Sequence, residues 1–145
     1  MSEAEIQDIL ERYKVIAVVG ASNQIGKPSH RVTAYLKQHG YKIIPVNPNI
    51  DKLFGEKSYP NLLEIPERIQ KTIDIVDIFR KAEDVPPIVE QSIELKRRVG
   101  RPFVVWMQLH IVNEAAAEAA RGAGLVVVMD KCMMHEHLHM RANQA

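Results

Sequence analysis

The feature that most constrains the fold of this chain is a run of five apolar residues, 15–19, that leads directly into Gly20. A β-branched run of this kind is typical of a strand buried on both faces. Small and polar residues follow, then Gly26, and a helical pattern begins at Pro28. The sequence therefore predicts a strand, a tight turn and a helix whose free N–H groups point into the turn, where they could hold a phosphate.

The turn matches neither of the two common phosphate-binding motifs. Five residues separate Gly20 from Gly26, and Ser22 lies where the dinucleotide fingerprint has a glycine. The P-loop has four residues between its glycines and Ser or Thr after its lysine, whereas here Pro28 follows Lys27. A plain βα turn that binds no ligand is therefore the alternative interpretation of this segment.

The composition limits the classes of protein and partner. At 145 residues the chain is expected to form one domain, residues 1–145, long enough to bury a single core. A net charge of +1 favours neither nucleic acid nor an acidic membrane surface. The sequence shows no secretory leader, no apolar run of membrane-spanning length, and one cysteine, which excludes an internal disulfide framework. We therefore expect a cytoplasmic protein, and the sequence leaves open a protein partner or a homo-oligomer.

Apolar runs and helix signals alternate along the chain. Buried strands are predicted at residues 15–19, 43–46, 73–79, 103–107 and 125–129, and helices at 2–13, 28–40, 84–100 and 113–121. Residues 51–68 are predicted to form a loop with one helical turn near Leu62, and a polar tail with histidines follows the last strand.

This alternation is typical of an α/β fold, a doubly wound, five-stranded parallel sheet with helices on both faces, in three layers. The right-handed crossover rule and the short connections favour the strand order 3-2-1-4-5. Ligands bind such sheets outside the carboxyl ends of the strands, near the point where the strand order reverses. In the expected order this point lies between the first and fourth strands.

The end of the second strand indicates which nucleotide this edge would hold. An NAD site usually has an acidic residue there, which takes the ribose hydroxyls. This chain instead has Asn47 and Pro48, with Lys52 soon after. The missing acid and the added cation favour a ligand with an extra phosphate near the ribose, which describes both NADP and coenzyme A.

The motifs of the chain resemble those of a known family, the small single-domain CoA-binding proteins. They are, in chain order, Val18-Val19-Gly20-Ala21-Ser22, Gly40-Tyr41, Pro45-Val46-Asn47-Pro48, Ile78-Phe79-Arg80, Val105-Trp106-Met107-Gln108 and Asp130-Lys131-Cys132. This family is related to the CoA-binding N-terminal domain of the succinyl-CoA synthetase alpha subunit. The resemblance covers nearly the whole chain and implies a Rossmann-like fold with CoA, or an acyl-CoA, across the strand ends. His110 departs from the pattern, because many relatives have a glycine there.

The edge positions and the resemblance together give a set of candidate ligand-binding residues: Gly20, Ala21, Ser22, Gly26, Lys27, Pro28, Asn47, Pro48, Lys52, Phe79, Arg80, Gln108 and Cys132. The resemblance implies that Ser22 and the turn amides hold phosphate, and that Asn47 and Pro48 line the nucleotide end. Arg80 is expected to make a charge contact. The alternatives are a solvated surface cation for Arg80, a loop cap for Gln108 and a core position for Trp106.

A second motif, His135-Glu136-His137-Leu138-His139, formally fits H-E-x-x-H, whose two histidines would lie on one helix face and bind zinc. Cys132 could be a further ligand. The motif lies six residues from the end of the sequence, with no following segment to wall a substrate cleft. We therefore expect no functional metal site.

The sequence shows no Ser-His-Asp order and no carboxylate pair suited to catalysis, and Cys132 is the one candidate nucleophile. This favours a CoA-binding module without catalysis of its own, and a small NADP-dependent oxidoreductase that uses the same edge is the alternative. In the expected strand order Cys132 follows a strand about 10 Å from the first strand. It could form a mixed disulfide with the thiol of CoA, or be an inert cysteine.

Overall fold

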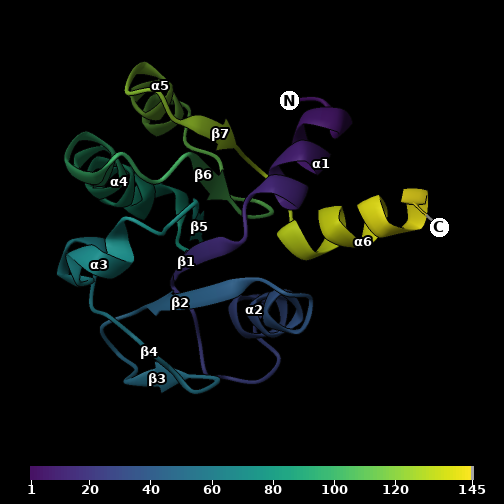
Figure 1. The fold of residues 1–145 in the computed structure, drawn as a ribbon, viewed down its shortest axis with the longest axis horizontal. Helices are drawn as coiled ribbons and strands as arrows, with labels where there is room; N and C mark the ends of the chain where they lie inside the picture. Colours follow the sequence, from purple (N-terminus) through teal and green to yellow (C-terminus); the bar gives the residue numbers. More distant parts are fainter. Residues whose placement is uncertain (145) are drawn as a thin grey trace.

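A five-stranded parallel sheet forms the centre of the protein in this computed structural model, which describes residues 1–144 (Figure 1). Its strands are β1 (Val15–Val19), β2 (Lys42–Val46), β5 (Ile75–Ile78), β6 (Val104–Met107) and β7 (Val126–Val128). They lie in the order β2-β1-β5-β6-β7, and every neighbouring pair is parallel. Each strand lies at one of the predicted apolar runs, so the α/β prediction is confirmed.

Helices cover both faces of the sheet. Their bounds are α1 (Glu3–Arg12), α2 (Pro28–Gln38), α3 (Glu67–Gln70), α4 (Val85–Val99), α5 (Glu114–Gly122) and α6 (Met133–Gln144), with 3₁₀ turns η1 (Leu62–Glu64) and η2 (Ala82–Asp84) and a small hairpin of β3 (Lys52–Leu53) and β4 (Glu56–Lys57). Figure 1 shows α1, α2 and α6 on one side of the sheet and α3, α4 and α5 on the other. This is the three-layer arrangement that the alternating pattern predicts.

The two faces of the sheet form two separate cores. Along β1, Ile16 and Val18 pack toward α1, α2 and α6, whereas Ala17 and Val19 pack toward α4 and α5. Successive side chains of a strand point to opposite faces, so a strand covered on both sides must be apolar at every position. That requirement explains the uninterrupted apolar run.

The predicted strand order was wrong in one respect. The third strand in the chain, β5, pairs with β1 and not with β2, which therefore lies at an edge of the sheet. Pro45 in β2 gives the physical reason, because proline has no N–H and cannot serve both neighbours of an inner strand. All of β5 is buried, as expected for a central strand. The order reverses between β1 and β5, so the strand-end rule predicts ligand binding there and not between the first and fourth strands.

Two further segments differ from the prediction. The expected polar tail is the helix α6, which packs against α1 and α2. Its buried residues are Met133, His137 and Met140, and His137 Nδ1 lies 2.7 Å from the hydroxyl oxygen of Tyr35 on α2. Residues 51–68, predicted as a loop, contain the β3–β4 hairpin as well as the short turn at Leu62. No helix within residues 1–144 is long and apolar enough to cross a membrane.

Candidate functional site

Gly20 ends β1 where that strand approaches the end of β5. Its φ is +90°, and a Cβ at this position would lie 2.3 Å from the carbonyl oxygen of Phe79. Its own N–H donates to the carbonyl oxygen of Val46 over 2.9 Å. The close approach of the ends of β1 and β5 therefore requires a glycine at this position.

The turn after Gly20 leads to an uncapped helix. The Ser22 hydroxyl accepts from the N–H of Gln24 over 3.0 Å, and Gly26 has a φ of +98°. Lys27 is the N-cap of α2 with Pro28 in the first turn, and within residues 1–144 no side chain caps this helix. Its first turn also contains no acidic residue. The positive end of the helix dipole is therefore uncompensated, which favours a bound anion.

Asn47 is buried, and its side chain connects the turn after β1 to the turn after β2. Its Nδ2 donates to the carbonyl oxygen of Ala21 over 2.8 Å, and its Oδ1 accepts from the N–H of Asn49 over 2.9 Å. Pro48 is exposed, and Lys52 lies on the exposed side of β3. These residues line neither of the two cavities of this edge described below. Direct contact of Asn47, Pro48 or Lys52 with a ligand stays a prediction.

A cavity of about 410 Å³ opens on the α2 and α6 face of the edge. We call it the cationic cavity; its lining is Lys27, Pro28, Ser29, Arg31, Val32, Phe79, Arg80, Lys81, Gln108, Leu109, His110, Ile111, Cys132 and His135. Four of these residues are Lys or Arg, and among the described lining residues none is Asp or Glu. The cavity thus brings six of the predicted residues together, from the start of α2, the end of β5, the end of β6 and the start of α6.

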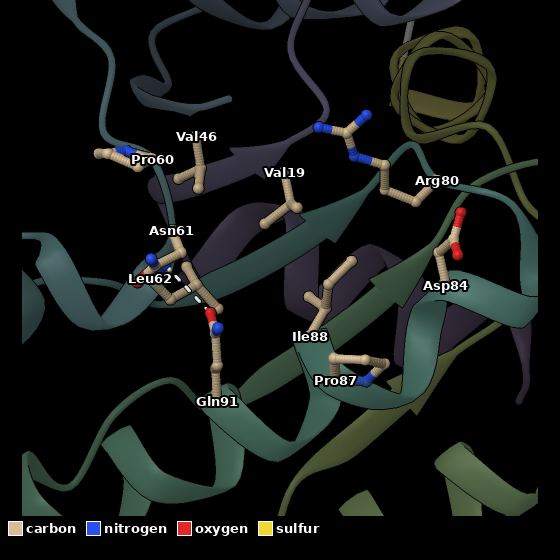
Figure 2. A pocket seen from close by; sticks show the side chains of 10 residues that line it. All are labelled: Val19, Val46, Pro60, Asn61, Leu62, Arg80, Asp84, Pro87, Ile88 and Gln91. Carbon is tan, nitrogen blue, oxygen red and sulfur yellow. Dashed lines mark hydrogen bonds between the residues drawn. The ribbon is translucent and has the colours of Figure 1, made fainter. Parts of the chain in front are cut away.

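A second cavity, of about 260 Å³, lies on the α4 face of the same edge. We call it the apolar slot, and Figure 2 shows its walls of Val19, Val46, Leu62 and Ile88, with Pro60 and Pro87 beside them. Arg80 and Asp84 lie at one end and Asn61 and Gln91 at the other (Figure 2). None of these residues except Arg80 was predicted to contact a ligand. Leu62 lies in η1, and Pro87, Ile88 and Gln91 lie in α4, away from the strand ends.

Arg80 lines both cavities. It directly follows Phe79, at the end of the central strand β5, and is partly exposed. Within residues 1–144 its side chain makes no hydrogen bond or ion pair. Because no group within residues 1–144 pairs with it, the Arg80 guanidinium is available to a ligand anion in either cavity.

Gln108 connects the floor of the cationic cavity to a buried acid. Its Nε2 donates to Oδ1 of Asp77 over 2.5 Å, and its Oε1 accepts from the N–H of Met133 over 3.3 Å. Asp77 is fully buried, which raises the pKa of its carboxyl to about 7 against the opposite effect of the Gln108 hydrogen bond. The sequence analysis missed Asp77, and its one signal was an acid within an otherwise apolar strand.

The loop after β6 explains the unusual His110. Its φ is +70°, a left-handed conformation that favours glycine, and its N–H donates to Oδ1 of Asp130 over 2.7 Å. The loop therefore has the backbone that a glycine would give. Nearby, Nε1 of Trp106 donates to the carbonyl oxygen of Lys131 over 2.8 Å, although the Trp106 side chain lies in the core.

Cys132 is 8% exposed and lines the cationic cavity. The expected distance from the first strand was wrong, because β7 lies three strands from β1 and not two. Cys132 still reaches the cavity that the start of α2 lines, because α6 turns back across the sheet and packs against α2.

The three histidines of the H-E-x-x-H segment lie in different surroundings. His135 lines the cationic cavity, His137 is buried against Tyr35, and His139 pairs with Glu3 of α1. In the described part of the chain, no three His, Cys, Asp or Glu side chains converge as a metal site would require.

Comparisons with known proteins show the family of the chain. The model of a CoA binding domain matches residues 14–138. The chain belongs to this family of CoA-binding domains. The family is homologous to the CoA-binding domain of ADP-forming acetate–CoA ligases. Nothing in the comparisons supports the alternative of an NADP-dependent oxidoreductase.

Three relatives illustrate the match. The uncharacterized protein YneT of Bacillus subtilis is 40% identical over 136 residues, 94% of each chain. A hypothetical protein from Pyrococcus horikoshii has a solved structure with 38% identity and a TM-score of 0.87, over 97% of this chain and 93% of that one. The ADP-forming acetate–CoA ligase II of Archaeoglobus fulgidus is 41% identical over 83 residues, which are 56% of this chain and 12% of the ligase.

Proposed function

We propose that the protein binds coenzyme A, or an acyl-CoA, across the carboxyl ends of β1 and β5, without catalysis of its own. The observation that carries the proposal is the charge of the cationic cavity, where Lys27, Arg31, Arg80 and Lys81 face one space without a carboxylate among the described lining residues. Such a cavity favours a ligand with several negative charges. CoA has three phosphates, and the membership of the chain in a CoA-binding family favours it over other polyanions.

The apolar slot suits the base of this ligand. Its walls are valine, leucine, isoleucine and proline side chains, which pack well against a flat ring. The Oε1 of Gln91 accepts from the N–H of Leu62 over 3.2 Å, so its amide N–H groups point elsewhere and can donate to a ring nitrogen. Asp84 at the other end can accept from an exocyclic amine (Figure 2).

The phosphates would then lie between the two cavities. Arg80 borders both, and the uncapped start of α2 at Lys27 lies on the cationic side. From there the pantetheine arm would follow the apolar part of the cationic cavity, along Leu109 and Ile111, toward Cys132. This placement uses each cavity for the part of CoA that matches its chemistry.

Isothermal titration calorimetry with CoA, acetyl-CoA, NADP and NAD tests the proposal. We expect CoA and acetyl-CoA to bind more tightly than NADP, and NAD to bind most weakly, because NAD lacks the extra phosphate. A thermal-shift measurement should give the same order, since a ligand that binds only the folded protein raises the melting temperature. Tighter binding of NAD than of CoA would overturn the proposal.

A further inference from the structure

Asp77 has a carboxyl oxygen that the fold leaves unpaired. The residue is fully buried, and within residues 1–144 its Oδ2 has no hydrogen-bond partner. Its neighbours in register are Val18 on β1 and Trp106 on β6, both in the core that α1, α2 and α6 cover. Buried polar atoms in folded proteins are nearly always paired, so an exception at the binding edge calls for an explanation.

The acid lies one hydrogen bond below the floor of the cationic cavity. Gln108 is 3% exposed and lines that cavity, while its Nε2 donates to Oδ1 of Asp77 over 2.5 Å. The same amide accepts from the N–H of Met133, the first residue of α6 and the neighbour of Cys132. Gln108 can make both bonds only in one orientation, with its oxygen toward α6 and its nitrogen toward Asp77.

No charged side chain within residues 1–144 pairs with Asp77. The titratable and charged groups above it are those of the cationic cavity: Lys27 and Arg31 of α2, Arg80 and Lys81 after β5, His110 after β6, and Cys132 and His135 at the start of α6. Burial in apolar surroundings disfavours the carboxylate and raises the pKa of Asp77 to about 7. The proton of this acid is therefore exchanged near neutral pH.

We propose that Asp77 is a positioning residue of the cationic cavity, which holds Gln108 against the start of α6 as a neutral acid and exchanges its proton as the cavity fills. We expect the cations above Gln108 to favour the carboxylate while the cavity is empty. A bound polyanion neutralises those cations and adds negative charge, which favours the neutral acid. Ligand binding therefore takes up a proton, and the affinity for the ligand decreases as the pH rises through the neutral range. The inference rests on the proposed function, because it requires an anion in this cavity.

Calorimetry of CoA binding in buffers with different heats of ionisation measures this proton uptake directly. The informative variant is Asp77→Asn, which keeps an oxygen for Gln108 but cannot titrate. Between about pH 6 and pH 8 the wild type should lose roughly two- to sixfold more affinity than Asp77→Asn, as a pKa change of about half to one unit near neutral pH requires. The ligand phosphates titrate in both experiments and cancel in the comparison.

The matched control is Glu83→Gln, which removes one carboxylate from an exposed position that lines neither cavity. On binding CoA, Glu83→Gln should take up as many protons as the wild type. Equal proton uptake by the wild type and Asp77→Asn would overturn the inference and leave CoA binding intact. Failure of every variant and the wild type to bind CoA would instead overturn the proposed function and the inference with it.

Two further measurements test the protonation state of Asp77, and the first uses the wild type alone. Infrared difference spectra near pH 7 should show a gain of neutral carboxyl absorption when CoA is added. Without ligand, the urea midpoint of the wild type should decrease relative to that of Asp77→Asn as the pH rises from about 4 to 7, because the unfolded chain ionises Asp77 first and the folded protein keeps its proton. A midpoint that rises over this range in the wild type relative to Asp77→Asn would show that Asp77 is not held neutral.

Discussion

The two cavities at the sheet edge share Arg80 but differ in charge. The cationic cavity has Lys27, Arg31 and Lys81 in addition, whereas the apolar slot has mostly aliphatic and proline walls. The helices that begin there, α2 and α4, both have proline in the first turn, and within residues 1–144 neither has a side-chain cap. The difference comes from their lining residues, because the start of α2 contributes Lys27 and Arg31 whereas α4 contributes only uncharged side chains. The edge is thus suited to one ligand with a strongly anionic part and a flat, neutral part.

The largest expected effect comes from the position where the two cavities meet. A Cβ on Gly20 would clash with the Phe79 carbonyl oxygen at 2.3 Å, and its φ is +90°. Gly20→Ala should cost roughly 1–2 kcal/mol for the left-handed backbone and about 1–3 kcal/mol more for the clash. Urea unfolding measures the loss, and CoA affinity should decrease because both cavities border these strand ends.

Gly26→Ala is the matched control. Gly26 has a φ of +98°, but among the described residues nothing lies within 4 Å of a Cβ there. It should therefore cost only the roughly 1–2 kcal/mol of the backbone conformation. Equal losses for the two variants would show that the close approach to Phe79 does not hold the cavities together.

The strands of the fold were predictable because each one depends on a short stretch of neighbouring residues. The apolar runs gave all five strands, because a strand buried on both faces must be apolar throughout. The strand order depends on contacts between distant segments, and the proline in β2 was its one sequence clue. The helix α6 was missed because its buried face includes His137, so that its apolar periodicity is weak.

The lining of the candidate site was predictable only in part. The rule that ligands bind at strand ends brought Lys27, Arg80, Gln108 and Cys132 to one cavity. It could not find the apolar slot, where Asn61 caps η1, Asp84 ends η2 and Gln91 lies on α4. It also could not show that Asn47 and Gln108 both use their side chains within the fold, and that of the two only Gln108 also lines one of these cavities.

Arg80→Ala tests whether one cation serves both cavities. The variant should bind CoA more weakly by roughly 1.5–3 kcal/mol, the range for hydrogen bonds to a charged group. Adenosine 3′,5′-bisphosphate should lose a similar amount, whereas pantetheine, which has no phosphate, should be unaffected. Calorimetry with these two fragments separates a phosphate contact from a general loss of the site.

Arg68→Ala controls for the change in net charge, because Arg68 is exposed and lines neither cavity. It should bind CoA as the wild type does. If Arg80→Ala folds and its dissociation constant for CoA is unchanged, Arg80 is a solvated cation and the two cavities do not share a phosphate.

The smallest change concerns Cys132, which lines the cationic cavity where the proposed pantetheine arm would end. With CoA disulfide as the oxidant, the Cys132 thiolate would attack one sulfur, form a Cys132–CoA disulfide and release CoA as the thiolate. Intact mass spectrometry should show this adduct, its removal by reductant, and its absence in Cys132→Ser. The proximity argument requires the adduct to form faster on the folded protein than on the chain unfolded in urea, although Cys132 is only 8% exposed. A slower reaction in the folded state would mean that the thiol is an inert, buried side chain, and that the arm of the ligand ends elsewhere in the cavity.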